Sequence, residues 1–301
     1  MLRCLLSVCV FVLAFAAARA TTTVRLPAGT CAADDTVFFD GFSGPVVVPS
    51  DPSSGSGGAM PVGGDLGATL PVPGVGTFDY YVHLPAGYDG SQAWPIVVAL
   101  HGAGSPASHA GAKTQAQATR AVWASLADAE GFIVLAPVSS GSSGGWLTGY
   151  DYIGIRAELD VVEASYNVER TRRYLWGFSA GGHVAWDIVL NGADYGTGFD
   201  ADALAGMAVS AGVMYAAACD PPPSGACDAL VASLERRLPI DLHVGLGDLL
   251  LPYVRHDRDL LLTHGWHLGR TLGYHEFSGS HAYTAAHLGQ AWAGLCRYAR
   301  D

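Results

Sequence analysis

Residues 171–183 read T-R-R-Y-L-W-G-F-S-A-G-G-H, and the pattern around Ser179 decides the fold. The apolar run at 174–176 predicts the end of a buried strand, and the apolar residues of 184–190 predict a helix that ends near Asn191. A serine framed by glycines between a strand and a helix forms a sharp turn, the nucleophile elbow, which exposes its hydroxyl above a sheet. We therefore expect Ser179 to be a nucleophile in an α/β protein.

The same G-x-S-x-G pattern occurs a second time at residues 141–145, with Ser143 at its centre. A chain with 39 glycines among 301 residues contains such a match by chance about once in three cases. Ser143 lies in a Ser/Gly run with no strand directly before it and no apolar helix after it, which predicts a flexible loop. The context therefore favours Ser179 over Ser143.

The first twenty residues have the pattern of a signal peptide. Arg3 supplies positive charge, residues 5–17 are apolar but too few to span a membrane comfortably, and residues 18–20 read A-R-A, a cleavage signal. The alternative is an uncleaved membrane anchor. We predict a signal peptide over 1–20 and an exported, soluble mature protein that is secreted or periplasmic.

The charge and length of the mature chain limit its partners. Without Arg3 and Arg19 it has 14 basic and 27 acidic side chains and a formal charge of −13. Such an acidic surface argues against nucleic acid and anionic membranes as partners. About 280 residues are enough for one α/β domain with a large core.

Four cysteines remain after removal of the signal peptide: Cys31, Cys219, Cys227 and Cys296. An even number in an exported chain predicts two disulfides, although four cysteines allow three pairings, and buried free thiols are the alternative. Cys219 and Cys227 flank a turn-rich loop that a local bridge could close, which would leave Cys31 to pair with Cys296. No Cys/His cluster has the spacing of metal ligands, so we expect no metal.

Residues 77–301 are predicted to form the catalytic domain, and residues 21–76 an N-terminal arm with a linker rich in Pro, Gly and Ser. In the domain, strands alternate with helices, which predicts a mostly parallel sheet with helices on both faces. Strands are expected over 78–84, 94–100, 132–136, 174–178, 204–210, 240–245 and 271–277, and helices over 114–129, 155–166, 180–191, 228–237, 253–268 and 283–300.

Ligands of an open α/β sheet bind at the carboxyl ends of its strands, so we expect the functional residues in the loops that follow the strands. The first such loop is His101-Gly102-Ala103-Gly104, whose small residues let backbone amides approach a ligand. The amides of Ala103 and Ala180 are the predicted oxyanion hole. The alternative is a turn that merely connects two elements. His101 is expected to be structural.

Two further strand ends carry an acid and a base. Asp248 follows the strand at 240–245 and is the predicted acid, and His281 follows the strand at 271–277 and is the predicted base. The order Ser179, Asp248, His281 is the order expected of an α/β-hydrolase. The competing acids Asp257 and Asp259 lie inside a predicted helix, where we expect them to be solvated. The competing histidines, His275 in a predicted strand and His287 in a predicted helix, are expected to be packed or solvated.

Residues 78–300 resemble the secreted esterases that include polyhydroxybutyrate depolymerases and feruloyl or acetylxylan esterases. The matching segments are YVHLPAGY at 81–88, PIVVALHG at 95–102, YNVER at 166–170, GFSAGG at 177–182, and Gly247-Asp248 with Pro252-Tyr253. The resemblance implies a serine carboxylic ester hydrolase of the α/β-hydrolase fold.

This resemblance implies that the substrate is a feruloyl or acetyl ester of a polysaccharide, or a polyhydroxyalkanoate-type polyester. No metal or organic cofactor is expected. Trp146 is a candidate wall of the substrate site, with a core tryptophan as the alternative. Three other functions remain open: a prolyl-peptidase-like peptidase, an acyltransferase, and an inactive polymer-binding protein. The sequence does not determine the oligomeric state.

Overall fold

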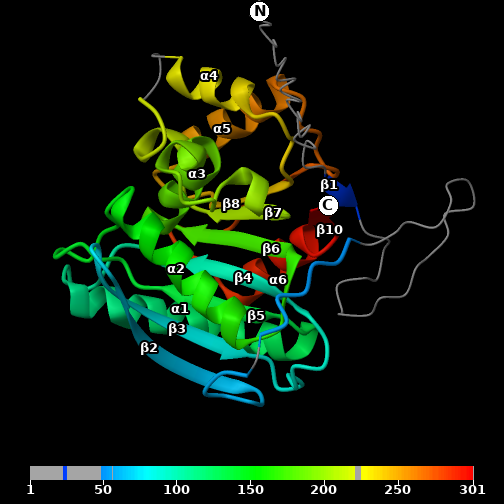
Figure 1. Cartoon of the computed structure of the whole chain (residues 1–301). Coiled ribbons are helices and arrows are strands. Elements are labelled where there is room, and N and C mark those ends of the chain that lie inside the picture. The colour runs from blue at the N-terminus through cyan, green and yellow to red at the C-terminus, as the bar shows by residue number, and fades with distance from the viewer. Residues whose placement is uncertain (1–22, 26–48, 56, 221–224, 301) are drawn as a thin grey trace, which may run out of the picture.

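Figure 1 shows the chain in a computed structural model, which describes residues 23–25, 49–55, 57–220 and 225–300. Within these residues eight strands form one mixed sheet in the order β2-β3-β5-β4-β6-β7-β8-β9. β3 is antiparallel to its neighbours β2 and β5, and the strands from β5 to β9 are mutually parallel. The strands are β2 (Gly64–Val72), β3 (Gly76–Leu84), β4 (Trp94–Leu100), β5 (Ile133–Pro137), β6 (Val168–Phe178), β7 (Gly206–Ser210), β8 (Ile240–Gly245) and β9 (Leu272–Phe277).

The sheet is buried on both faces, which explains the continuous apolar run of β4. Val97 and Ala99 belong to a core with side chains of α1 (His109–Glu130) and α6 (Ala285–Leu295). Ile96, Val98 and Leu100 belong to a larger core, on the opposite face, with side chains of the remaining helices. In Figure 1, α2 lies in front of the sheet and α6 behind it. Those remaining helices are α2 (Tyr150–Ser165), α3 (Ala180–Asn191), α4 (Ala226–Ser233) and α5 (Leu251–Thr263).

The described residues also form several short elements outside the main sheet and its helices. Three single-turn 3-10 helices connect the larger elements: η1 (Gly192–Tyr195), η2 (Ala201–Ala203) and η3 (Met214–Ala216). β1 (Thr23–Arg25) and β10 (Tyr298–Arg300) form a separate antiparallel pair. The prediction of a helix over 283–300 is therefore wrong at both ends, because α6 ends at Leu295 and residues 298–300 pair with a strand from the far end of the chain.

The predicted linker is also wrong over its last part. Residues 64–72 are the edge strand β2, with the alternating burial of a half-covered strand: Leu66 and Leu70 are partly covered, and Asp65 and Thr69 are exposed. Gly67 and Pro71 made this segment resemble a loop, but an edge strand tolerates proline because one side of it needs no hydrogen bonds. The sheet therefore begins at Gly64 rather than after residue 76.

Several helix boundaries differ from those expected. α1 begins earlier, at His109, because the Ser108 side chain accepts a hydrogen bond from the Gly111 amide (3.0 Å) and caps the helix. α2 begins at Tyr150 rather than at 155, and α4 ends at Ser233 rather than at 237. α5 ends at Thr263 because Gly265 has a φ of 88°, a left-handed conformation that interrupts the helix. None of the described helices is long and apolar enough to cross a membrane.

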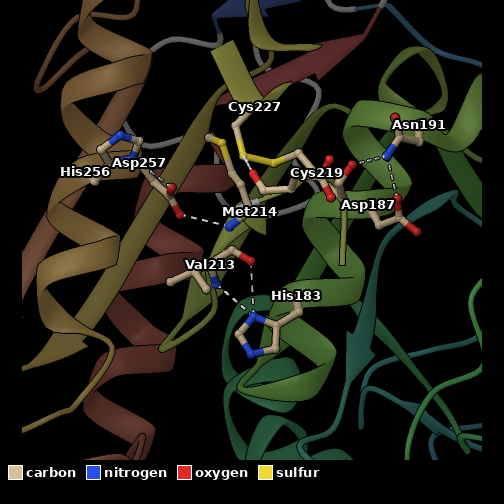
Figure 2. Close-up of a disulfide and its surroundings, with 11 residues drawn as sticks. His183, Asp187, Asn191, Val213, Met214, Cys219, Cys227, His256 and Asp257 are labelled. Carbon is tan, nitrogen blue, oxygen red and sulfur yellow. Dashed lines mark hydrogen bonds and ion pairs between the residues drawn. A yellow bond between two sulfur atoms is a disulfide. The ribbon is translucent and has the colours of Figure 1, made fainter. Parts of the chain in front are cut away.

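The Cys219–Cys227 bridge is confirmed, with Cα atoms 5.2 Å apart (Figure 2). It joins the segment that follows η3 to the first turn of α4. Cys31 lies outside the described residues, as do the predicted signal peptide at 1–20 and residues 26–48 of the predicted arm, so the Cys31–Cys296 pairing stays a prediction. Cys296 is fully buried at the end of α6.

Removing the local bridge is expected to lower stability moderately. A disulfide that closes a loop of about nine residues limits the unfolded chain and contributes about 2–3 kcal/mol. The variant Cys219→Ser/Cys227→Ser should therefore unfold at a lower temperature than the parent. Thermal unfolding in the absence of reductant measures this. A midpoint unchanged by the double substitution would show that the bridge does not constrain the unfolded chain.

Candidate active site

The elbow is built as the sequence predicts. β6 ends at Phe178, α3 starts at Ala180, and Ser179 between them has a φ of 52° and a ψ of −119°. Positive φ is rare for a residue other than glycine and stores strain that the surroundings must hold in place. The Ser179 amide donates to the carbonyl of Ser210 at the end of β7 (2.9 Å), and this bond fixes the turn on the sheet.

The glycines on either side of Ser179 are required by close packing. A Cβ atom on Gly177 would lie 2.3 Å from the carbonyl oxygen of Gly181, and one on Gly181 would lie 2.3 Å from the carbonyl oxygen of Leu100. Both distances are far below van der Waals contact, and both contacts are with backbone, which cannot move aside. The G-x-S-x-G pattern is therefore a packing requirement of the turn between β6 and α3.

The three residues predicted to act together are joined by hydrogen bonds. His281 Nε2 lies 2.7 Å from Ser179 Oγ, and His281 Nδ1 lies 2.8 Å from Asp248 Oδ2. Because a carboxylate can only accept, Nδ1 carries the proton and donates it to Asp248, and Nε2 accepts from the Ser179 hydroxyl. The side chain of Asp248 is buried and that of His281 is 42% exposed, so the histidine can meet a ligand from solvent.

The predicted acid and base follow neighbouring strands, and hydrogen bonds join the loops that carry them. Asp248 follows β8 and His281 follows β9, and these two strands pair in parallel. The amide of Leu246 donates to the carbonyl of Phe277 (2.8 Å), and that of Gly247 donates to the carbonyl of Gly279 (2.7 Å). The parallel register thus brings together two residues that are 33 positions apart.

The predicted oxyanion loop lies beside the serine. A Cβ atom built on Gly102 would be 3.5 Å from Ser179 Cβ, which places this loop next to the nucleophile. Ala103 is exposed, and within the described residues its amide donates no hydrogen bond. Ala180 is the first residue of α3, where an amide has no helical acceptor. Both amides therefore have the freedom that an oxyanion donor needs.

The second G-x-S-x-G copy supports this loop rather than carrying chemistry. Ser143 is exposed in a turn. The carbonyl of its neighbour Gly144 accepts from the Gly104 amide (2.8 Å) and from the Ser139 hydroxyl (3.1 Å). This places the segment around Ser143 against the back of the oxyanion loop.

His101 and Trp146 form one packed unit. His101 is fully buried, and burial lowers the pKa of its imidazole to about 4, so the ring is neutral at neutral pH. Its Nε2 accepts from the Ser139 amide (3.1 Å), in agreement with the expected structural role. Trp146 is only partly buried, its ring centre is 4.8 Å from that of His101, and its Nε1 donates to the His101 carbonyl (3.0 Å).

The sequence analysis did not single out His183, which follows the elbow glycines. Its Nδ1 accepts from the amide of Val213 (2.9 Å), as Figure 2 shows. Burial lowers its pKa, and the positive charge of the nearby His281, when protonated, lowers it further. The sequence contained one indication that His183 belongs near the site: it directly follows Gly181-Gly182 of the elbow. The residue holds the start of α3 against the loop after β7.

Asp257 was expected to be solvated, and this expectation is wrong. The side chain is 2% exposed because it points inward from α5, where its Oδ2 accepts from the amide of Met214 (3.0 Å, Figure 2). It does not contact His281, so it does not compete with Asp248. Burial raises the pKa of Asp257 to about 7. Asp259, two residues further along α5, is exposed as expected.

Asp257→Asn is expected to stabilise the protein at alkaline pH. Because the pKa of Asp257 is raised from 3.8 to about 7, the folded state binds this proton more tightly than the unfolded chain. Stability from this group is therefore greatest below pH 4 and is lost as the pH rises toward 7. An amide oxygen can accept from Met214 without burying a charge, so the gain at pH 8 should be on the order of 2–4 kcal/mol.

Denaturant unfolding of Asp257→Asn and of the exposed control Asp259→Asn, at pH 5 and pH 8, measures this effect. The free energy of unfolding at pH 8 should rise for Asp257→Asn and not for Asp259→Asn. The rise for Asp257→Asn should be much smaller at pH 5. An equal effect at both pH values would contradict the assignment.

The sheet order, the elbow and the strand-end loops together define the α/β-hydrolase class. Residues 76–263 match the family described as "Putative esterase", and the chain belongs to this family. It is a serine carboxylic ester hydrolase. No curated protein matches the chain in sequence.

Solved structures share the fold at low sequence identity. A ferulic acid esterase superposes with a TM-score of 0.58 and 17% identity, over 78% of this chain and 98% of its own. The feruloyl esterase module from Clostridium thermocellum, complexed with sinapinate, superposes with a TM-score of 0.53 and 18% identity, over 83% of this chain and 93% of its own. The Porphyromonas gingivalis dipeptidyl peptidase 4 superposes with a TM-score of 0.54 and 13% identity, over 78% of this chain and 35% of its own. At such identities the likeness shows the fold alone, because one fold hosts several reactions.

Proposed function

We propose that the chain is a secreted serine esterase in which Ser179 is the nucleophile, His281 the general base and Asp248 the acid that orients it. The observation that carries the proposal is the unbroken set of hydrogen bonds from Asp248 Oδ2 through the imidazole to Ser179 Oγ, at 2.8 and 2.7 Å. The strained backbone of Ser179 supports it, since such strain is characteristic of functional residues.

The proposed reaction has two stages. Ser179 Oγ attacks the ester carbonyl while His281 Nε2 takes its proton, and the amides of Ala103 and Ala180 bind the oxyanion. The alcohol then leaves with the proton from His281, which gives an acyl-enzyme. In the second stage His281 takes a proton from water, and the resulting attack releases the acid and restores the Ser179 hydroxyl.

The proposed substrates are feruloyl or acetyl esters of polysaccharides, or polyesters of the polyhydroxyalkanoate type. Trp146, partly exposed beside the oxyanion loop, is the proposed wall for an aromatic or sugar-linked group. Apolar side chains are also exposed near the acid: Leu249, next to Asp248, is 90% exposed, and Leu246 is 54% exposed. Apolar groups beside a reactive centre favour a substrate with apolar surface of its own.

A substrate panel tests this proposal. p-Nitrophenyl acetate and butyrate measure ester hydrolysis as such, and methyl ferulate, acetylated xylan and polyhydroxybutyrate separate the proposed classes. We expect turnover of the p-nitrophenyl esters and of at least one of the three others. If Trp146 forms the wall, Trp146→Ala should raise KM for the aromatic or polymeric ester and leave p-nitrophenyl acetate nearly unaffected.

The alternatives have their own readouts. The dipeptidyl peptidase neighbour favours a test with an aminoacyl-prolyl p-nitroanilide, whose cleavage at rates above those for esters would support a peptidase. Faster formation of a new ester in the presence of an added alcohol would support acyl transfer. An inactive polymer-binding protein would turn over none of these substrates and would not react with a fluorophosphonate.

The proposed export rests on the pattern of residues 1–20. The protein recovered from the medium or periplasm should begin at Thr21, which N-terminal sequencing shows directly. Recovery of the full chain from the membrane fraction would favour the anchor instead.

A further inference from the structure

Three metal-ligating side chains meet on the α6-facing side of β8 and β9. His243 and His275 occupy paired positions of the two parallel strands, and Asp241 lies two residues before His243, on the same face. Leu242 and Val244, which point the other way, belong to the larger core. The corresponding face of the central strands is apolar, so this cluster interrupts an otherwise apolar layer beneath α6.

The cluster is buried and poorly satisfied. Asp241 is 3% exposed and His243 is 1% exposed. Within the described part of the chain, neither ring nitrogen of His243 makes a hydrogen bond of good geometry. Asp241 Oδ1 likewise has no well-aligned hydrogen bond and contacts the imidazoles of His243 and His275 at 3.3 and 3.1 Å. Poorly aligned polar contacts in a protein interior cost stability, and an ion that takes these atoms as ligands would satisfy them.

The distances suit a single metal ion. Asp241 Oδ1 lies 3.3 Å from His243 Nε2 and 3.1 Å from His275 Nε2, and one ligand atom from each residue lies within 4.8 Å of the others. A tetrahedral zinc ion with bonds of about 2.1 Å separates its ligand atoms by about 3.4 Å. An ion placed among these atoms would thus use the two contacts of Asp241 Oδ1 almost as they stand.

The surroundings leave room for the carboxylate and a route for an ion. A Cβ atom on Gly273 or on Gly294 would lie 2.3 Å from an Asp241 carboxylate oxygen, so both positions must lack a side chain for Asp241 to sit there. A cavity of about 290 Å³ borders Asp241 and His275. It can admit an ion, and water in it can fill a fourth coordination position.

We propose that Asp241, His243 and His275 bind a divalent transition-metal ion, with zinc as the expected occupant. Two imidazoles and one carboxylate, with a water in the fourth position, are a common ligand set for zinc. The bound ion would cross-link β8 to β9 below the loops that carry Asp248 and His281. The ion is expected to stabilise this part of the sheet. This effect does not depend on which ester the enzyme cleaves.

The chemistry of the cluster makes metal binding depend on pH. An imidazole nitrogen must be free of its proton to bind a metal ion, so binding is expected to weaken as the pH falls. A third histidine, His287 of α6, lies near the cluster, with its ring centre 6.5 Å from that of His243.

Zinc binding by the mature protein without a histidine tag tests the proposal. The protein is treated with a chelator, desalted and titrated with Zn²⁺ at pH 7.5 in competition with a chromophoric chelator, and thermal unfolding is followed at each addition. We expect one tight equivalent and, at a hundredfold excess over Kd, an unfolding midpoint raised by about 5 °C. The wild-type chain binding no tight equivalent would overturn the proposal, whatever the variants do.

Two variants and a control locate the site. Asp241→Asn and His275→Ala should each abolish the tight equivalent and the rise of the midpoint. The matched control is His264→Ala, because His264 is also paired with an aspartate, Asp228 (2.9 Å), but outside the cluster. Tight binding that survives both cluster substitutions would place the ion elsewhere and contradict the assignment. Co²⁺ gives a second readout on the wild type: visible absorption of a tetrahedral complex is expected, and only the weak absorption of hydrated Co²⁺ would argue against the site.

Discussion

Ser179→Ala is expected to lower kcat for p-nitrophenyl butyrate by about 10⁴- to 10⁶-fold. The substitution removes the atom that would form the acyl-enzyme, and the hydrogen bond from Ser179 Oγ to His281 Nε2 is lost with it. KM should change little, because the hydroxyl contributes to the reaction rather than to binding. The remaining rate would come from the oxyanion donors and from substrate positioning.

The chain offers a matched control for this substitution. Ser143 stands in the second G-x-S-x-G copy, is exposed, and should be replaceable by alanine with no more than a twofold change in kcat. Circular dichroism and thermal unfolding of both variants verify that the fold is retained. Substantial hydrolysis by folded Ser179→Ala, or loss of hydrolysis in Ser143→Ala, would overturn the assignment of the nucleophile.

Asp248→Asn is expected to have the second-largest effect, a loss of kcat of about 10³- to 10⁴-fold. The buried carboxylate accepts a hydrogen bond from Nδ1–H of His281 (2.8 Å) and would stabilise the imidazolium that forms when the serine proton is transferred. An amide is neutral, and its NH₂ group can turn toward Nδ1 and favour the wrong tautomer. Most of the loss should therefore appear in kcat rather than in KM.

Asp259→Asn is the control for this second substitution. Asp259 lies on α5, which follows the Asp248 loop, but its side chain is exposed and pairs with Arg258 (2.7 Å). It should retain nearly full activity. Steady-state kinetics of the two variants on p-nitrophenyl butyrate make the comparison. A loss of less than about tenfold in Asp248→Asn would show that another residue orients His281.

Local patterns predicted the parts of the fold that local forces determine. The limits of β4 and β8 agree with the sequence prediction, because a run of apolar residues bounded by a loop allows one interpretation in a parallel sheet. The turn at Ser179 was equally clear, since the close contacts of Gly177 and Gly181 leave glycine as the residue that fits. The loops that follow the strands at 240–245 and 271–277 likewise allowed Asp248 and His281 to be predicted as the acid and the base.

Elements that depend on a distant partner were not predicted. β2 contains Gly67 and Pro71 and is stable because β3 pairs with its whole length. β10 is a strand because residues 23–25 lie beside it. Asp257 gave no sign of burial, since the fit of α5 against η3 decides which side of that helix is covered.

The cluster of Asp241, His243 and His275 was not predicted from the sequence, because it too depends on a distant partner. Its members do not follow the spacing of a local metal motif, because His243 and its partner His275 on the next strand are 32 positions apart. Only the register of β8 with β9 brings them together.

Labelling with a fluorophosphonate, followed by mass mapping of the modified peptide, tests the central assignment most directly. Only a serine activated by a neighbouring base should react at a useful rate, so one label per chain is expected, on Ser179. His281→Ala should label far more slowly, and Ser143→Ala should label like the parent. A label on Ser143, or no label on a folded and catalytically active protein, would contradict the proposed mechanism.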